Sequence, residues 1–449
     1  MQRLTNLPAR RTPEAPGCRV VIDLRPLQEP ERTPITAAYL ERLLDAYAAR
    51  PVAGESFVVL LRTGRDDPAD DLERRGLVVG GRRRLPPTAR LLRSGGLTLD
   101  SFLLRGAEVG TARDIGSSGA AGALYHTAGG AVPLGSRLPV VATLLDLAPW
   151  ELPEVYARSA AARFGHRLRA RVLHDAARLI VASRATGESA RRRIHIRPER
   201  IVVVPLAADD AFGPDAAAPE RVAEIRARLG LPERYLVFAG RYDARKDLGT
   251  LFAALAGLRE EGRPRSTRRG AGAASGAGAA SGTGAASAVD AEPWPPLVVL
   301  AGAAGADESD VAALGRAAER HGVADLVRLT PRLDGAAMAA LESGARGFVF
   351  PSISEGTGLA ALEALACGVP VVASKTGPLP EIVGAAGIIV EPRDAARLAE
   401  ALRAVWSDGR IHDQLARTAR TRAAGPRRTW HDVARETRAV YAEAAATVP

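Results

Sequence analysis

The segment Phe348–Val372, FVFPSISEGTGLAALEALACGVPVV, places two carboxylates around the start of a predicted helix. Its apolar strand ends at Pro351, a polar loop follows, and the helix begins near Gly358. The free N–H groups and the dipole at such a helix start favour an anion. Glu355 in the loop and Glu363 in the helix are expected to flank one pocket, where a carboxylate can accept neighbouring hydroxyls of a ribose or a hexose. The alternative is a capping acid followed by a solvated glutamate.

A second segment, Leu236–Lys246, LVFAGRYDARK, combines a strand with a glycine and two cations. Gly240 lets the backbone approach a ligand closely, and Arg241 and Lys246 can offset the charge that develops on a diphosphate leaving group. Lys246 is one of only two lysines, with Lys375, in a chain whose other basic residues are arginines. We therefore predict a diphosphate site here. The alternative is an ordinary cation at a helix start.

The elements that must position these residues follow a βαβ rhythm. Short β-branched runs alternate with Ala/Leu/Arg segments of helical period, which predicts an α/β chain of two doubly wound parallel sheets. Ligands bind such sheets outside the carboxyl ends of the strands. The predicted strands are residues 19–24, 57–61, 122–125, 139–143, 179–182 and 201–204 in the first half, and 235–239, 297–301, 326–329, 347–350, 369–373 and 387–390 in the second.

These elements predict a first domain over residues 18–213 and a second over 214–425, followed by a C-terminal helical segment over 426–449. The Gly/Ala/Ser tract at 262–296 contains almost nothing to bury and cannot offset its ordering entropy, so we predict a disordered insertion there. Residues 1–17 are also expected to be disordered. They contain no apolar stretch long enough for a signal peptide.

The bulk composition narrows the classes of function. The formal net charge of +10 favours an anionic partner, although a bias toward arginine codons explains it equally well. Aromatic residues total only 4%, and the basic runs Arg82–Arg84 and Arg191–Arg193 have no aromatics between them, which argues against nucleic acid. Cys18 and Cys367 cannot form a disulfide framework, and no long apolar run occurs, so we expect a cytoplasmic protein. The two runs leave open a peripheral contact with an anionic membrane.

The two chemical segments together resemble the family 4 glycosyltransferases of the GT-B fold, most strongly from Tyr235 to Val405. The resemblance implies two Rossmann-like domains that face each other across a cleft, with the C-terminal helix crossing back onto the first domain. It implies that Arg241 and Lys246 hold the donor pyrophosphate, and that Glu355 contacts the donor sugar and Glu363 the ribose. Further donor contacts would come from Gly240, from backbone groups of Gly356, Thr357, Gly358 and Leu359, and from Arg332 and Leu333 beside the nucleobase.

The first domain matches this family less closely. His126 lies at the end of a predicted strand and corresponds to an active-site histidine of the family that faces the cleft; a structural histidine is the alternative. Leu145-Asp146 stands where many relatives have His-Asp. The family's glycine-rich loop is replaced by Glu31–Thr36, in which Thr33 and Thr36 are expected to donate hydrogen bonds instead. Ser183 matches a family serine and is also a good helix N-cap.

The resemblance implies a retaining transfer of a sugar, of the hexosyltransferase class, from a nucleotide-diphosphate-sugar donor. The acceptor is expected to be a glycan or a lipid-linked saccharide of unknown identity, as in polysaccharide biosynthesis. No metal or other cofactor is expected, because protein cations take the place of a divalent ion. The departures in the first domain keep open an alternative, a non-catalytic GT-B-fold partner subunit. A nicotinamide-dependent dehydrogenase is excluded, since no Gly-x-Gly-x-x-Gly turn follows a strand.

Overall fold

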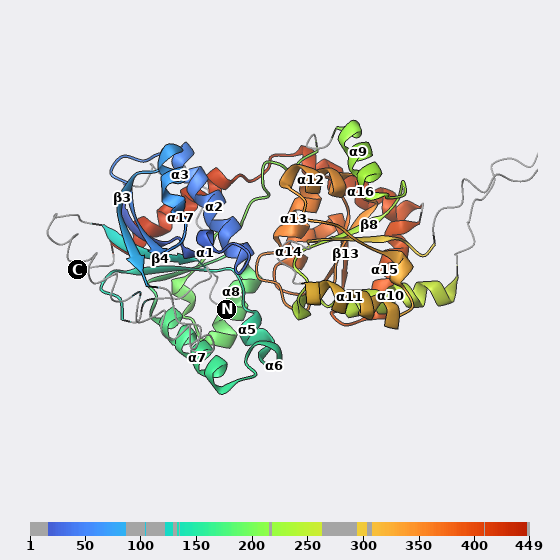
Figure 1. Cartoon of the computed structure of the whole chain (residues 1–449), viewed down its shortest axis with the longest axis horizontal. Coiled ribbons are helices and arrows are strands. Elements are labelled where there is room, and N and C mark those ends of the chain that lie inside the picture. Colours follow the sequence, from blue (N-terminus) through green and yellow to red (C-terminus); the bar gives the residue numbers. More distant parts are fainter. Residues whose placement is uncertain are drawn as a thin grey trace, which may run out of the picture.

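The computed structural model of the chain describes residues 17–86, 104, 122–128, 133, 135–214, 218–262, 294–302, 308–407 and 409–446. The tract predicted to be disordered lies almost entirely outside these residues, as does nearly all of the N-terminal segment. Two α/β lobes lie side by side (Figure 1), and each is built on one parallel sheet. The predicted pair of doubly wound sheets is therefore confirmed.

The first lobe has a seven-stranded sheet in the order β3-β2-β1-β4-β5-β6-β7, with every neighbouring pair parallel. Its strands are β1 (Arg19–Asp23), β2 (Ser56–Arg62), β3 (Val79–Leu85), β4 (Ala123–Ala128), β5 (Val140–Leu144), β6 (Arg178–Val181) and β7 (Ile201–Val203). Its helices are α1 (Arg25–Gln28), α2 (Pro34–Ala49), α3 (Pro68–Arg74), α5 (Ala148–Glu151), α6 (Pro153–Tyr156), α7 (Ala160–Asp175) and α8 (Arg184–Ile194).

The second lobe has a six-stranded parallel sheet in the order β10-β9-β8-β11-β12-β13. Its strands are β8 (Leu236–Ala239), β9 (Val298–Ala301), β10 (Val327–Leu329), β11 (Gly347–Phe350), β12 (Val371–Ser374) and β13 (Gly387–Val390). The helices that follow the first lobe are α9 (Pro219–Leu229), α10 (Leu248–Glu261), α11 (Glu308–Arg320), α12 (Gly335–Ser343), α13 (Leu359–Ala366), α14 (Leu379–Val383), α15 (Ala395–Trp406), α16 (Arg410–Ala424) and α17 (Trp430–Ala445).

Alternation along the strands divides the core of the first lobe between the two faces of its sheet. Val20 and Ile22 of β1 pack with α2, α3 and α17, whereas Val21 packs with α7 and α8 on the opposite face. Both faces are apolar because a parallel sheet is covered by helices on each side. The second lobe buries its strands in one large cluster with α10, α13 and α15.

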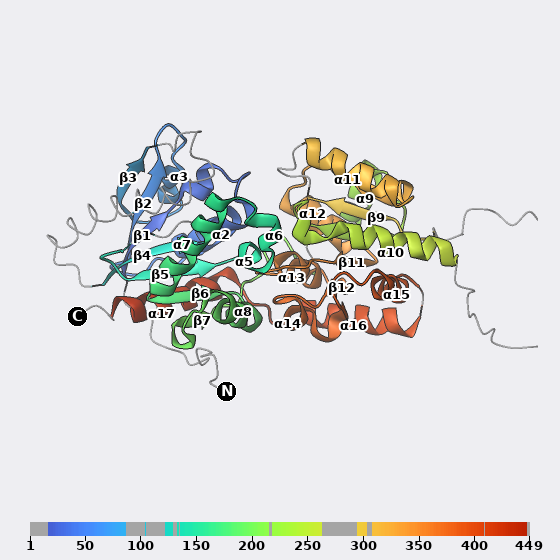
Figure 2. The ribbon, with the colours of Figure 1, turned by 90° about the horizontal axis from the view of Figure 1, so that it is seen from below.

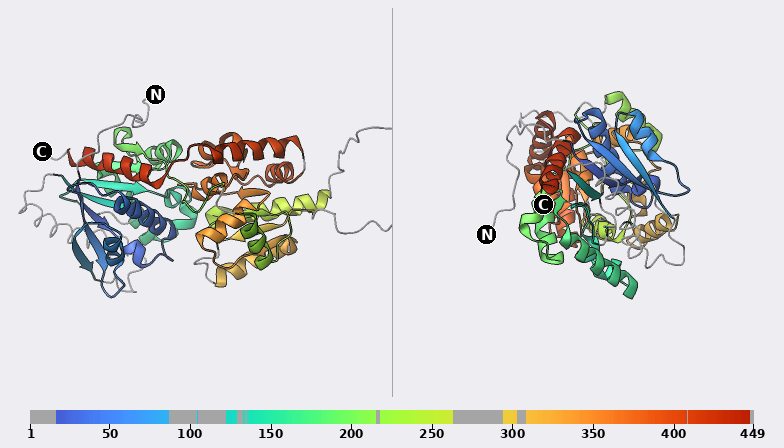
Figure 3. Two further views of the ribbon diagram at one scale, coloured as in Figure 1. Left: turned by 90° about the horizontal axis from the view of Figure 1, so that it is seen from above. Right: turned by 90° about the vertical axis from the view of Figure 1, so that its left-hand side faces the viewer.

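The C-terminal helix α17 returns to the first lobe and packs against α2, β4 and β5 (Figure 2). It begins with a capping box in which Thr429 and Asp432 satisfy each other's backbone N–H groups. Along one side of the molecule, α16 of the second lobe is followed by α17 on the first (Figure 3). The predicted crossing helix is confirmed, and the chain therefore passes between the lobes twice.

The basic run Arg82–Arg84 belongs to an edge strand, β3, that the sequence analysis did not predict. Its side chains alternate between exposed and partly buried positions, and Arg82 makes ion pairs with Asp67, Asp70 and Glu73 around α3. The strand was not predicted because its glycines and arginines have a low β propensity, which an exposed edge strand tolerates. Much of the charge of this run is thus matched by the lobe's own acids.

Candidate active site

The two chemical segments meet because β8 and β11 are neighbours at the centre of the second sheet. The strand order reverses between them, and the loops after a reversal point open a crevice at the carboxyl edge. The loop after β8 forms a 3₁₀ turn, Ala244–Lys246, and the loop after β11 leads into α13. The backbone N–H of Ile353 donates to the carbonyl of Arg245 at 2.8 Å, which joins the two loops directly.

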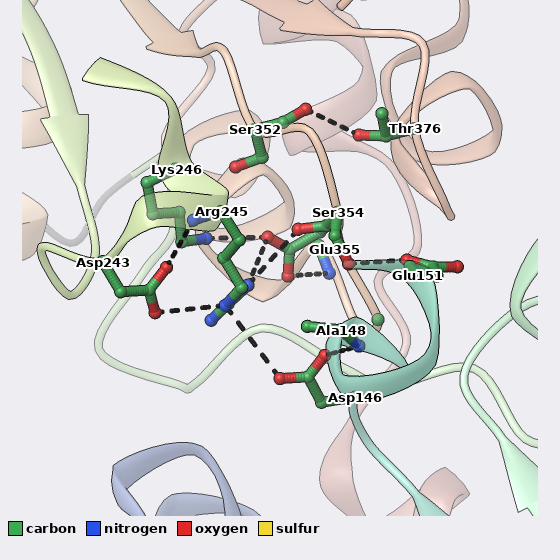
Figure 4. A network of polar contacts seen from close by, with 12 residues as sticks. Asp146, Ala148, Glu151, Asp243, Arg245, Lys246, Ser352, Ser354, Glu355 and Thr376 are labelled. Atoms are coloured by element: carbon green, nitrogen blue, oxygen red, sulfur yellow. Dashed lines mark hydrogen bonds and ion pairs between the residues drawn. The ribbon is translucent and has the colours of Figure 1, made fainter. Parts of the chain in front are cut away.

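Glu355 is the centre of a buried cluster of charges in this crevice (Figure 4). Its Oε2 accepts a hydrogen bond from Lys246 Nζ at 2.7 Å and one from Arg245 Nη1 at 3.3 Å, and its Oε1 accepts one from the N–H of Gly358 at 3.3 Å. Burial alone would raise the pKa of Glu355, but the two cations outweigh it and hold that pKa at about 2. Glu355 is therefore ionised throughout the physiological range.

Lys246 is nearly fully buried and lies with its Nζ 4.0 Å from the centroid of the Phe350 ring. Burial lowers its pKa, and the negative charge of Glu355 opposes that effect. Gly240, at φ +144°, leaves room for this side chain, because a Cβ at that position would lie 3.4 Å from Lys246 Cε. The glycine and the lysine of the second segment thus form one packed unit.

Arg245 belongs to the site, and the sequence analysis missed it. Its guanidinium is almost fully buried and contacts Asp243 at 3.2 Å, Glu355 at 3.3 Å and Asp146 at 4.0 Å. Burial opposes its charge, but these acids together raise its pKa. Asp243 could have indicated this role in the sequence. Its side chain accepts a hydrogen bond from the N–H of Arg245, and a turn capped in this way fixes the directions of Arg245 and Lys246.

Arg241, the cation that the sequence analysis selected, lines the same crevice and is half-buried. Within the described part of the chain it has no ion-pair or hydrogen-bond partner. The three cations of the loop therefore differ: Arg245 and Lys246 pair with acids of the protein, whereas Arg241 is available to an anionic ligand.

Glu363 lies one helical step deeper, on α13. Its Oε1 is 3.4 Å from Arg42 Nη2 of the first lobe. Burial raises the pKa of Glu363, the positive charge of Arg42 lowers it, and the negative charge of Asp209 raises it. The resulting pKa is about 7. The two predicted carboxylates therefore share one pocket but differ in protonation near neutral pH. The alternative of a solvated helix glutamate is wrong, because the side chain is only 13% exposed.

A cavity of about 530 Å³ between the lobes brings most of the predicted donor residues together. From the second lobe it is lined by Gly240, Arg241, Lys246, Glu355, Thr357, Leu359 and Glu363. From the first lobe it is lined by residues that include Arg32, Thr33, Thr36, Arg42, Asp146 and Arg169. The two threonines of the loop that replaces the glycine-rich loop thus face the predicted donor site.

Two of the predicted backbone donors make other contacts in this structure. A Cβ on Gly356 would lie 2.1 Å from the carbonyl oxygen of Leu145, so the glycine allows the two lobes to approach at this point. Gly358, at φ +64°, begins α13, but its N–H already donates to Glu355. Neither residue lines the cavity, and of the four predicted positions only Thr357 and Leu359 do.

The expectation that His126 faces the cleft is wrong. The residue is completely buried in β4, where its Nε2 is 2.9 Å from Thr143 Oγ1 and its Nδ1 is 2.8 Å from the hydroxyl of Tyr441 on α17. Burial lowers its pKa to about 3, so the ring is neutral. The side chain of His126 points into the core because of its position on β4. The alternative, a structural histidine, therefore describes this residue.

Arg332 and Leu333 do not line the cavity described above. Arg332 is 68% exposed and makes an ion pair with Glu31 of the first lobe at 2.8 Å. Leu333 packs against the core of the second lobe. In this conformation, the loop that was expected to border a nucleobase therefore forms an ion pair between the lobes. Ser183 caps α8 through the N–H of Thr186, as its second interpretation predicted.

Several further contacts join the lobes around the cavity. Glu151 accepts a hydrogen bond from Ser354 of the second lobe and another from Ser189 of its own lobe, and the hydroxyl of Thr186 donates to the carbonyl of Gly356 at 3.0 Å. Glu381 accepts a hydrogen bond from the N–H of Ala185. Polar contacts therefore join the two lobes in this conformation. The described residues contain no group of three or more His, Cys, Asp or Glu side chains that could hold a metal ion.

Two facing doubly wound lobes, with a charged cavity at the reversal point of one sheet, have the architecture of the GT-B fold. Solved structures share this architecture. Sucrose-phosphate synthase from Thermosynechococcus elongatus superimposes with a TM-score of 0.63 at 21% identity, over 96% of this chain and all of that one. Anabaena Alr3699/HepE, solved in complex with UDP and glucose, gives a TM-score of 0.62 at 17% identity, over 96% of this chain and 99% of that one.

Residues 289–422 match the family model of glycosyl transferases group 1. D-inositol 3-phosphate glycosyltransferase of Xylanimonas cellulosilytica is 31% identical over 322 residues, which cover 70% of this chain and 67% of the relative. The chain belongs to the group 1 glycosyltransferases. It is a transferase enzyme with the GT-B fold, as the resemblance implied. None of the helices that the structure describes is both long and apolar enough to span a bilayer.

Proposed function

We propose that the chain transfers a hexose from a nucleoside-diphosphate-sugar to a hydroxyl acceptor, with retention of the anomeric configuration and without a metal ion. The observation that carries the proposal is the shared cavity, in which Arg241 and Lys246 lie beside Glu355 and Glu363. Two cations beside two carboxylates match a donor that has a diphosphate between two polyhydroxyl groups. The UDP and glucose of the Anabaena structure support the choice of donor class.

In this proposal the diphosphate lies against Arg241 and Lys246, whose charges stabilise the leaving group as the bond from C1 of the sugar to the phosphate oxygen breaks. Glu355 accepts hydroxyls of the sugar and Glu363 those of the ribose. The acceptor oxygen bonds to C1 on the face that the phosphate leaves, and its proton passes to the departing phosphate oxygen. Contacts such as that of Glu151 with Ser354 keep the lobes together and exclude water.

For the acceptor we propose a glycan, lipid-linked or phosphorylated hydroxyl compound that enters from the first lobe. Arg32 and Arg169 line that side of the cavity, and the relative from Xylanimonas is named for a phosphorylated inositol. An anionic group on the acceptor matches these arginines. Arg169 also lies with its guanidinium carbon 5.3 Å from the centroid of the Trp150 ring, which fixes its direction.

The proposal is tested by a transfer assay with UDP-, GDP- and ADP-sugars in the presence of EDTA, with wild type and Glu355→Gln compared. Product formation by wild type, with the anomeric configuration of the donor sugar preserved in the product, is the expected result. The non-catalytic alternative predicts that a nucleotide binds but that neither transfer nor donor hydrolysis occurs. Activity that EDTA abolishes and a divalent ion restores would refute the metal-independent mechanism.

We also propose that any peripheral contact with anionic lipid involves Arg191–Arg193 of α8 and not Arg82–Arg84. The first run is exposed, and in the structure's described portion Arg192 has no hydrogen-bond or ion-pair partner. Co-sedimentation with phosphatidylglycerol vesicles is expected to fall when Arg192 and Arg193 are changed to Gln, and to weaken with salt. Binding that persists unchanged in this variant would contradict the assignment.

A further inference from the structure

Arg42 of α2 contacts residues from three other parts of the chain. Its Nε is 2.8 Å from Asp209 Oδ2, in the segment that joins the lobes. Its Nη2 is 3.4 Å from Glu363 Oε1 on α13. Its guanidinium carbon lies 5.9 Å from the centroid of the Trp430 ring at the start of α17. The Arg42 side chain therefore contacts both segments that connect the lobes, and it also contacts Glu363 in the donor cavity.

Arg42 and Glu363 both line the cavity, yet the contact between them leaves capacity for a ligand. Only Oε1 of Glu363 is engaged, at a distance longer than a strong charge-assisted bond. Among the described residues, Oε2 of Glu363 has no hydrogen-bond partner, and this atom is accessible from the surface. The carboxylate is therefore oriented from one side and open on the other.

We propose that Arg42 is a positioning residue for donor binding, which orients the carboxylate of Glu363 from the opposite lobe. This inference rests on the proposed function, because it takes Glu363 as the group that accepts the ribose hydroxyls. A consequence is that the ribose site is complete only while the first lobe lies against the second. Donor affinity and closure of the lobes are then coupled through this one contact.

The charges around Glu363 explain why its carboxylate needs a partner. Arg42 faces it from α2, Asp209 from the joining segment, Glu342 from α12, and Cys367 follows it at the end of α13. Arg42 is the only cation among these groups. With burial and Asp209 raising it and Arg42 lowering it, the pKa of Glu363 is about 7. Loss of Arg42 therefore raises this pKa further and reduces the ionised fraction near neutrality.

The test is the affinity of a nucleoside diphosphate, measured by titration calorimetry at pH 6, 7 and 9 with wild type and Arg42→Gln. The probe is whichever of UDP, GDP and ADP gives the largest thermal shift with wild type. If loss of the cation raises the pKa of Glu363 by about one unit, the affinity falls about 5-fold at pH 7 and about 10-fold at pH 6. At pH 9 the two proteins bind within about 1.5-fold, because Glu363 is ionised in both. Titration of the probe itself cancels in the ratio.

Two further variants separate this role from a structural one. In a Glu363→Gln background, Arg42→Gln is expected to change the affinity by less than about 2-fold at every pH, because residues that act through one contact are not additive. Arg438→Gln is the matched control. Arg438 makes an ion pair with Glu55 at 2.7 Å and lies over Tyr47, but it does not line the cavity. Its variant is expected to lower Tm without a pH-dependent loss of affinity.

Arg42→Lys is expected to recover most of the affinity at pH 7, since it restores the charge. A loss in Arg42→Gln that is equal at pH 6 and pH 9, or equally large without Glu363, would overturn the inference and leave a packing role. If Arg42→Gln binds like wild type while Glu363→Gln does not, the inference fails and the proposed function stands. If wild type binds none of the three probes, the proposed function itself fails.

Discussion

Substitution of Lys246 by methionine tests the buried charge cluster, because it keeps the length of the side chain and removes its charge. Lys246 Nζ is 2.7 Å from Glu355 Oε2, and both side chains are about 5% exposed. Removal of one partner from a buried pair costs about 3–5 kcal/mol. Arg245 still contacts the same oxygen at 3.3 Å, so we expect a loss at the lower end, about 3 kcal/mol. A diphosphate that loses one charge-assisted contact should bind about 10- to 100-fold more weakly.

The pH dependence of stability gives this variant a second signature. The folded-state pKa of Glu355 is about 2, below its usual 4.5. The stabilisation from this group is therefore present above pH 4.5 and is lost as the pH falls toward 2. The difference corresponds to about 3 kcal/mol. Because Lys246 contributes most to the lowered pKa, Lys246→Met should unfold with a shallower acid dependence than wild type.

The matched control is Lys375→Met, which removes the other lysine of the chain. Lys375 is 62% exposed and pairs with the similarly exposed Glu391, so its loss should leave the stability nearly unchanged. Urea unfolding between pH 2.5 and 7, and thermal shifts with nucleoside diphosphates, measure both effects. Equal stability and equal nucleotide affinity of the two lysine variants would refute the reasoning.

Three other variants test separate parts of the account. His126→Leu should lower stability by about 1–3 kcal/mol, because it leaves the buried Tyr441 hydroxyl without its partner; a 100-fold loss of kcat at unchanged Tm would instead restore a catalytic role. Glu342→Gln should raise Tm at pH 7 but not below pH 4.5. The carboxylate oxygens of Glu342 have no partner in the described structure, and burial raises its pKa well above its usual value. Folding therefore favours the protonated form, and stability is lost as the pH rises above the pKa of the unfolded state; an unchanged Tm at pH 7 would contradict this. Gly356→Ala should reduce transfer more than 10-fold while each lobe stays folded, because its Cβ would meet the Leu145 carbonyl; wild-type activity would show that the lobes need not meet there.

Most of the sheet architecture could be predicted from the sequence, because buried parallel strands are short apolar runs between helical segments. The meeting of Glu355 with Lys246 followed from the rule that carboxyl ends of central strands share one edge. The exceptions have local causes. Strand β3 contains two glycines and three arginines, and its pairing with β2 rests on backbone hydrogen bonds that composition does not reveal.

The residues that sequence reasoning misplaced depend on distant packing. The direction of His126 is decided by Tyr441, more than three hundred positions away in the chain. Arg42 lies in an ordinary amphipathic helix, and its contact with Glu363 exists only because the lobes face each other. Arg332 follows a strand of the second lobe, yet its partner is Glu31 of the first. Contacts between lobes leave no periodic signal in the sequence, so they required the structure.

The most direct test of the central claim is a crystal structure of the chain with a bound nucleoside diphosphate. The expected result is a diphosphate within hydrogen-bonding distance of Lys246 Nζ and the Arg241 guanidinium, with the ribose hydroxyls on Glu363. A nucleotide bound outside the cavity between the lobes, or one whose phosphates contact neither cation, would contradict it.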